Sequence, residues 1–116
     1  MSNSHISNAY CVILTTTGSQ EEANRLAEQL VSHRLAACVQ IVSVDSCYRW
    51  KGEVTRDAEY LLLIKTATRL YAQVEKALLE NHSYELPEII QLPVNQGLDR
   101  YLGWITENTN QEGIGS

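Results

Sequence analysis

Residues 38–66 read CVQIVSVDSCYRWKGEVTRDAEYLLLIKT, and this stretch decides the fold. β-Branched, apolar and aromatic residues are frequent in both halves, which is the composition of paired strands. Lys51 and Gly52 separate the halves, and a two-residue loop with glycine second is typical of a primed hairpin turn. We therefore predict one long hairpin formed by residues 36–50 and 53–66. Its register pairs Trp50 with Glu53, Val42 with Leu61 and Val39 with Ile64.

Shorter periodic segments lie on either side of the hairpin. Residues 10–17 are apolar and β-branched without alternation, as expected of a central strand covered on both faces. Ser19, followed three residues later by Glu22, forms a capping box at the start of a helical repeat of apolar residues. The expected helices are 20–33, 68–82 and a shorter one marked by Leu98, Tyr101, Leu102 and Ile105, with a short strand at 89–94.

The order of these elements is strand, helix, strand, strand, helix, strand and a final helix. Right-handed crossovers leave few layouts for that order, and the split βαβ sandwich is the natural one. The predicted fold class is therefore α/β (α+β), a ferredoxin-like sandwich with a long central hairpin and an extra C-terminal helix. We expect a single domain over residues 9–108, with flexible tails at 1–8 and 109–116.

The hairpin is too long for the helices that its own chain supplies. A strand over 38–50 spans about 40 Å at roughly 3.3 Å per residue. The helix over 20–33 is only about 21 Å long, at about 1.5 Å per residue. The overhanging part carries Tyr48 and Trp50, and its long strand edges are open to pairing with another chain. We therefore predict a homo-oligomer with Tyr48 and Trp50 at the interface.

The bulk composition is that of an ordinary globular domain. The 116 residues are 44% hydrophobic and 20% charged, with a formal net charge of -5. Lysine and arginine form no cluster in the sequence, so nucleic acid and anionic membranes are not expected partners. The sequence contains no apolar run of membrane-spanning length, and MSNSHISNAY at 1–10 has no export-signal pattern. We therefore expect a cytoplasmic protein.

The sequence lacks the motifs of familiar catalytic sites. It contains no glycine-rich phosphate loop, no H-E-x-x-H motif and no recognisable nucleophile with its base. Cys11, Cys38 and Cys47 are odd in number and far apart, which suits neither a disulfide framework nor a zinc site. We expect them to be small buried hydrophobic residues. The sequence thus predicts a binding protein that is not an enzyme and has no obligatory cofactor.

One stretch outside the hairpin concentrates reactive groups, and it reads ENHSYELPEII at 80–90. Pro87 ends the preceding helix and suits the entry of the following strand, so a structural joint explains the apolar residues. A joint does not explain the polar set, which is His82, Tyr84, Glu85 and Glu88. Strand alternation sends Glu88 away from the core, towards solvent or a neighbouring chain.

Five blocks of sequence, in order along the chain, resemble the CutA family of divalent-cation tolerance proteins. They are LAAC at 35–38, YRWKGEV at 48–54, LLLIKT at 61–66, HSYELPEI at 82–89 and YLGW at 101–104. The resemblance implies a ferredoxin-like subunit that forms a homotrimer around its hairpins and serves tolerance of copper and other divalent metals. PII signalling proteins share that trimeric architecture. The alternative function is therefore a sensor of a small anionic ligand in an inter-subunit cleft.

The resemblance places a copper site at a cysteine near the end of the first strand and at two adjacent histidines. Thr15 stands at the cysteine position, and Asn81 and His82 stand at the histidine pair. Threonine and asparagine are weak ligands for a metal that prefers thiolate and imidazole. We therefore expect a weak, solvent-exposed site for copper or a similar divalent ion at His82 and Glu85. Because neutral imidazole is the ligand, the affinity should fall in acid.

The resemblance also implies a ligand cleft between subunits, bordered by the segment at 82–89, which we call the proline-containing segment. Its members in this chain are Trp50, Glu59, Lys65, Tyr84 and Glu88. Such a cleft would bind an anion through Lys65, or a cation through Glu59 and Glu88. The sequence leaves both possibilities open.

Overall fold

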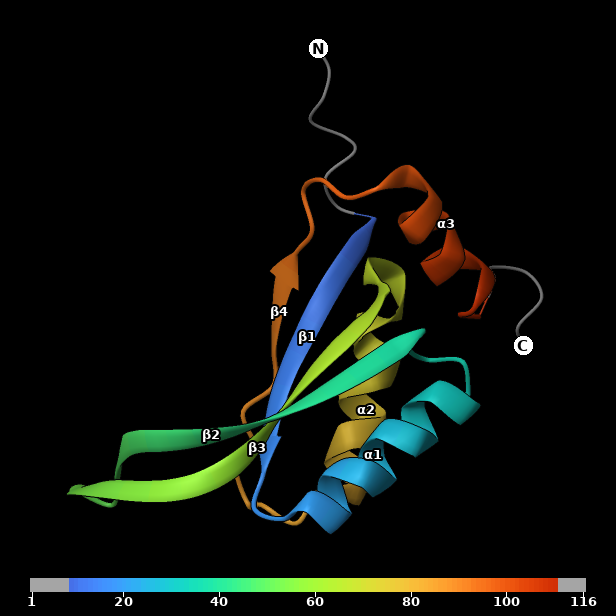
Figure 1. Cartoon of the computed structure of the whole chain (residues 1–116). Coiled ribbons are helices and arrows are strands. Elements are labelled where there is room, and N and C mark those ends of the chain that lie inside the picture. Colours follow the sequence, from blue (N-terminus) through green and yellow to red (C-terminus); the bar gives the residue numbers. More distant parts are fainter. Residues whose placement is uncertain (1–8, 111–116) are drawn as a thin grey trace.

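The computed structural model describes residues 9–110, which form one four-stranded antiparallel sheet with helices (Figure 1). The strand order is β2-β3-β1-β4, which is the order of a ferredoxin-like sandwich. The predicted fold class and element order are confirmed. The strands are β1 (Tyr10–Thr17), β2 (Cys38–Trp50), β3 (Glu53–Ala67) and β4 (Ile90–Pro93). The helices are α1 (Gln20–Ser32), α2 (Tyr71–Asn81) and α3 (Asp99–Glu107), and a 3₁₀ turn, η2 (Thr68–Leu70), precedes α2.

The β2–β3 hairpin has the predicted register, including the pairs Trp50–Glu53, Val42–Leu61 and Val39–Ile64. Lys51 and Gly52 have φ angles of 51° and 83°, as a primed turn requires at both central positions. Figure 1 shows the hairpin tip projecting beyond α1 and α2. The overhang expected from the element lengths is therefore present.

The hydrophobic core lies between one face of the sheet and the pair α1 and α2. The sheet contributes Ile13, Leu62 and Ile64, all fully buried, because alternate residues of β1 and β3 face the helices. The helices contribute Ala23, Leu26, Leu30, Val74 and Leu78. The Ser19 hydroxyl accepts a hydrogen bond from the Glu22 N–H at 3.1 Å, so the predicted cap of α1 is confirmed.

The opposite face of the sheet is apolar and largely uncovered by the chain itself. We call it the open face, and its residues are Leu14, Val42, Leu61, Leu63, Ile90 and Leu92. Helix α3 reaches one end of the sheet, where the Tyr10 hydroxyl lies 2.6 Å from the Thr106 hydroxyl. Val42, Ile90 and Leu92 are each nearly half exposed, so this face is available to another chain.

Two expectations about the sequence need correction. Cys11 is buried as expected, but Cys47 is exposed, three residues before the end of β2 at the hairpin tip. The flexible tail expected at 109–116 includes two residues, 109 and 110, that are part of the folded domain. Thr109 is completely buried, and the Asn110 N–H donates to the Arg34 carbonyl at 2.9 Å. The tail residues 1–8 and 111–116 lie outside the described residues.

Candidate functional site

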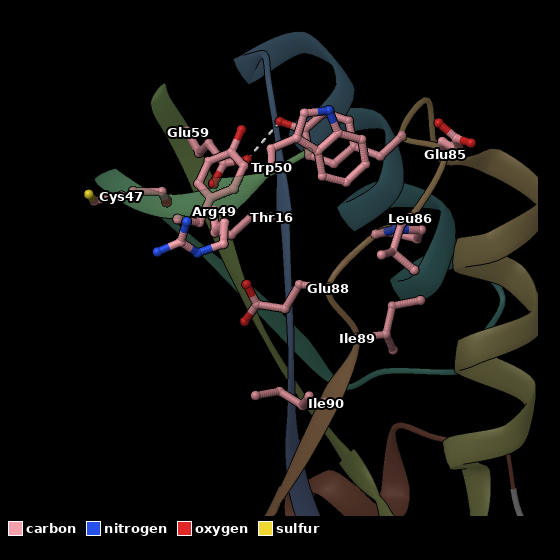
Figure 2. A pocket seen from close by; sticks show the side chains of 14 residues that line it. Thr16, Cys47, Arg49, Trp50, Glu59, Glu85, Leu86, Glu88, Ile89 and Ile90 are labelled. Atoms are coloured by element: carbon pink, nitrogen blue, oxygen red, sulfur yellow. Dashed lines mark hydrogen bonds between the residues drawn. The ribbon is translucent and has the colours of Figure 1, made fainter. Parts of the chain in front are cut away.

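A groove of about 860 Å³ lies between the hairpin tip and the segment that leads into β4. We call it the hairpin groove. Figure 2 shows its lining side chains, which come from Thr16, residues 46–50, Glu59 and residues 84–90. The hairpin contributes one wall and the proline-containing segment contributes the other. The part of the hairpin that projects beyond the helices therefore also forms one wall of the groove.

Tyr84 and Glu59 form the polar centre of the groove. The Tyr84 hydroxyl donates a hydrogen bond of 2.7 Å to Glu59 Oε2, although only 7% of Glu59 is exposed. Burial raises the pKa of the Tyr84 phenol well above its usual range, and the hydrogen bond and charge of Glu59 raise it further. The phenol therefore stays neutral and acts as a donor to a carboxylate.

His82 fixes the start of the proline-containing segment from behind. The Tyr84 N–H donates to His82 Nδ1 at 3.1 Å, so the ring proton is on Nε2. That nitrogen in turn donates to the Thr16 carbonyl at 2.8 Å. Both ring nitrogens are thus engaged, and only 1% of the His82 side chain is exposed. The imidazole couples the segment directly to β1.

Glu22 of α1 holds the neighbouring residue. Its carboxylate accepts bonds from both the Ser83 N–H, at 2.8 Å, and the Ser83 hydroxyl, at 2.9 Å. Glu22 Oε2 also lies 3.7 Å from His82 Nδ1. The sequence assigned Glu22 to the helix cap, and the bonds to a residue 61 positions away were not expected. Nothing in the local pattern around Ser83 indicates this partner.

The structure brings together four of the five residues expected in the ligand cleft. Trp50, Glu59, Tyr84 and Glu88 all line the hairpin groove. Lys65 does not, because it lies about 20 Å further along β3 than Glu59, at roughly 3.3 Å per residue. Its ammonium lies over the Tyr101 ring of α3, 5.7 Å from the centroid. Within one chain, Lys65 therefore belongs to the opposite end of the sheet.

The groove also contains residues that the sequence did not indicate. Arg49 is the single cation among its lining residues, and Leu86 is 73% exposed beside it. Arginine in a strand and leucine before a proline carry no pattern that distinguishes them from ordinary surface residues. Their placement depends on the meeting of two distant segments.

The expected metal ligands do not form a ready-made site. The buried, doubly bonded imidazole of His82 differs from the solvent-exposed ligand that the sequence suggested, because the ring packs under the chain at β1. Glu85 is exposed, and Figure 2 shows its carboxylate pointing in the opposite direction from that of Glu88. Thr15 is fully buried. Within residues 9–110, no three His, Cys, Asp or Glu side chains gather closely enough to hold a metal ion.

A family model described as CutA1 divalent ion tolerance protein matches residues 11–108. This chain belongs to the CutA1 family. It is 46% identical over 99 residues to the divalent-cation tolerance protein CutA of Thermus thermophilus, covering 84% of this chain and 96% of that protein. It is 40% identical to the chloroplastic CutA of Arabidopsis thaliana, of which it covers 54%.

Solved CutA1 structures share the fold over nearly the whole domain. The CutA1 structure from Thermus thermophilus has a TM-score of 0.84 at 45% identity, covering 87% of this chain and 99% of that one. The CutA1 structure from Oryza sativa has a TM-score of 0.87 at 38% identity, covering 91% and 98% of the two chains. The CutA structure from Archaeoglobus fulgidus is described as periplasmic, so CutA relatives occupy more than one compartment. In this CutA chain, residues 9–110 include no helix with the length and apolar character of a membrane span.

The Tyr84–Glu59 hydrogen bond predicts a defined dependence of stability on pH. Because the pKa of Tyr84 is raised in the folded state, the hydrogen bond contributes its full stability below the usual tyrosine pKa of about 10. That stability is lost as the pH rises from there through the higher pKa of Tyr84 in the folded protein. Tyr84→Phe should cost about 1–3 kcal/mol at neutral pH, because Glu59 keeps its charge and loses its donor. It should also flatten the alkaline fall in stability.

Urea unfolding at about pH 8 and about pH 10.5 measures both effects. Tyr10→Phe is the matched control, because its hydroxyl lies against Thr106 instead of a carboxylate. That variant should follow the wild-type pH dependence. If Tyr84→Phe loses as much stability in alkali as the wild type, the hydrogen bond is not the cause.

Proposed function

We propose that this chain serves divalent metal ion tolerance, copper included, as a non-catalytic homotrimer in the cytoplasm that binds metal weakly. Membership of the CutA1 divalent ion tolerance family carries the proposal. Cell fractionation with an antibody to the chain tests the proposed location. The assembly and the metal site are argued separately below.

The open face supports the proposed trimer. All four strands present apolar side chains there, and Val42, Ile90 and Leu92 remain nearly half exposed in the single chain. Tyr48 and Trp50 add two further half-exposed aromatic side chains at the hairpin tip. An apolar surface that extends over neighbouring strands is typical of an interface. A head-to-tail contact between copies that closes on itself produces a ring, and three copies is the number that the family resemblance implies.

Metal binding at His82 and Glu85 is expected to be weak. A metal at His82 must displace either the Tyr84 N–H from Nδ1 or the bond from Nε2 to the Thr16 carbonyl. Losing such a bond costs about 1 kcal/mol and offsets part of the metal–imidazole attraction. Glu85 and a carboxylate of a neighbouring chain would then supply oxygen ligands. Oxygen with one imidazole suits copper(II) or zinc in an open site.

Calorimetric titration with Cu²⁺ should therefore give a dissociation constant of about 1 µM or weaker. This corresponds to a binding free energy of about −8 kcal/mol or one that is less favourable. The affinity should fall in acid, since only neutral imidazole binds metal. His82→Ala should weaken copper binding. His33→Ala should not, because His33 is exposed and its ring hydrogen-bonds only with the Gln29 carbonyl of its own helix among the described residues. Nanomolar, pH-insensitive binding that survives His82→Ala would place the metal elsewhere.

The alternative function is a PII-like sensor of a small anion in the inter-subunit cleft. Arg49 favours it, because a guanidinium lines the groove. Lys65, which the hypothesis also needs, reaches the groove only if a neighbouring copy supplies it. A thermal-shift screen across metal ions, nucleotides and carboxylates separates the two functions. A shift with anions that depends on Lys65 would favour the sensor.

A further inference from the structure

Three consecutive residues at the start of the proline-containing segment are held by other parts of the fold, and we call their bonds the clasp. The His82 ring donates to the Thr16 carbonyl of β1 and accepts from the Tyr84 N–H, at 2.8 and 3.1 Å. Ser83 donates both its N–H and its hydroxyl to the Glu22 carboxylate of α1, at 2.8 and 2.9 Å. The clasp therefore fastens the segment to a strand and to a helix at once.

The Tyr84 side chain encloses the clasp. Its ring centroid lies 5.0 Å from that of His82, so the two rings pack together. Its hydroxyl donates to Glu59 of the hairpin at 2.7 Å, and a Cβ added at Gly18 would lie only 3.2 Å from the same oxygen. Only 1% of the His82 side chain is exposed in this enclosure. The imidazole therefore reaches solvent only when its neighbours move.

The closed clasp leaves His82 no nitrogen for a metal ion. A metal takes the lone pair of a neutral imidazole and needs room for further ligands. The Nδ1 lone pair accepts from the Tyr84 N–H, and Nε2 carries the proton that it donates to the Thr16 carbonyl. Within residues 9–110, no set of three potential ligands surrounds the ring. The residues as folded therefore do not fit a bound metal.

We propose that the clasp must open before His82 binds a metal ion, so that metal binding and release of the proline-containing segment are coupled. This inference rests on the proposed metal function and describes how that site is regulated. The apparent association constant is then the intrinsic one multiplied by the fraction of open molecules. A mostly closed clasp makes binding weak. Opening also draws Tyr84 away from Glu59, which transmits the change to the hairpin.

Ser83→Ala tests the coupling, because it loosens the clasp without changing a charge or an expected metal ligand. In calorimetric titrations of the full chain in its own assembly, it should tighten Cu²⁺ binding about five- to tenfold. The reason is that losing a hydrogen bond to a charged group raises the open fraction by about that factor. Tyr84→Phe removes the anchor on Glu59 and should also tighten binding. Both variants should thus lose stability and gain affinity.

Three further variants separate the clasp from general effects. Ser32→Ala removes the same group at the end of α1, where the hydroxyl makes no hydrogen bond within residues 9–110, and should change the affinity less than twofold. Tyr10→Phe should lower stability without raising the affinity, since its hydroxyl lies against Thr106, away from the clasp. Adding His82→Ala to Ser83→Ala should remove the gain, because the gain acts through the imidazole.

Amide hydrogen exchange gives a second readout that does not depend on affinity. Saturating Zn²⁺, a diamagnetic probe, should speed exchange at Ser83 and Tyr84, because opening releases both N–H groups from their acceptors. The Ala23 amide is the internal control. It bonds to the Ser19 carbonyl at the start of α1 and should exchange at an unchanged rate.

The outcomes distinguish this inference from the metal function on which it rests. Copper binding that is present in the wild type but not tightened by Ser83→Ala overturns the coupling alone. Slower exchange at Ser83 and Tyr84 on adding Zn²⁺ does the same, because the metal would then bind to the closed clasp. Absence of copper binding in the wild type and in every variant overturns the metal function and the coupling together.

Discussion

Val42→Lys combined with Ile90→Lys is expected to abolish the proposed trimer. Both side chains lie on the open face, with 47% and 48% of their surface exposed in the single chain. The exposure means that lysine fits the isolated fold without strain. In a trimer that covers this face, two buried ammonium groups per chain would cost several kcal/mol each, which strongly opposes assembly.

Sedimentation equilibrium measures the result directly. The wild type should have three times the 13.1 kDa mass of one chain, and the double variant should have the mass of a monomer. Its melting temperature should also be much lower, because assembly stabilises the folded chain by mass action. The milder pair Tyr48→Ala and Trp50→Ala should make the melting temperature lower and dependent on protein concentration.

The helix side of the molecule offers a matched control. Val31 and Leu79 lie on α1 and α2 and are 42% and 56% exposed, close to the values on the open face. Lysine at both positions adds the same charge to a surface that the proposal leaves in solvent. That variant should remain a trimer. A trimer that tolerates Val42→Lys and Ile90→Lys, or one that fails with the control, would show that the interface lies elsewhere.

Ile64→Ala is expected to be the most destabilising single truncation. Ile64 is completely buried on β3, opposite Ile13 of β1 and Val39 of β2. It lies in the core between the sheet and the two helices. Removing three buried carbons leaves a cavity that strands on both sides hold open, so the cost should be about 2–5 kcal/mol. A marginally stable domain would lose a large part of its stability.

Urea unfolding at one fixed protein concentration measures the loss, because the proposed trimer would unfold with a concentration-dependent midpoint. Leu86→Ala is the matched control, since Leu86 is 73% exposed in the groove and its truncation should cost at most about 0.5 kcal/mol. A cost below about 1 kcal/mol for Ile64→Ala would mean that the core collapses around the cavity.

The hairpin shows what local sequence can determine. Its turn conformation follows from Lys51 and Gly52, and the turn alone sets the pairing from Trp50–Glu53 to Val39–Ile64. Once the register is fixed, alternation assigns each side chain to the covered face or the open face. Helices α1 and α2 follow from apolar spacing in the same way. These features are predictable because each depends on residues close together in the chain or on one repeating period.

The groove shows what local sequence leaves open. Periodicity assigned Glu88 a direction but gave no distance to Glu59, and it placed Lys65 in a strand without showing which end of the sheet it would occupy. Lys65 is too far along β3 from Glu59 to reach the groove of its own chain. The position of the groove on the sheet depends on where the proline-containing segment packs beside the hairpin. The family resemblance supplied a set of cleft residues, whereas the geometry divides them.

The sequence by itself determined the element order, the hairpin register and the family, because turn chemistry, side-chain period and ordered motifs are all local. Only the tertiary structure decided that the His82 ring is buried and hydrogen-bonded to the Thr16 carbonyl, 66 positions away, and that Ser83 is hydrogen-bonded to the Glu22 carboxylate. A single histidine or glutamate accepts many partners, and its choice depends on which elements pack together. Packing fixes that choice because a buried polar group must find a partner wherever the fold places one.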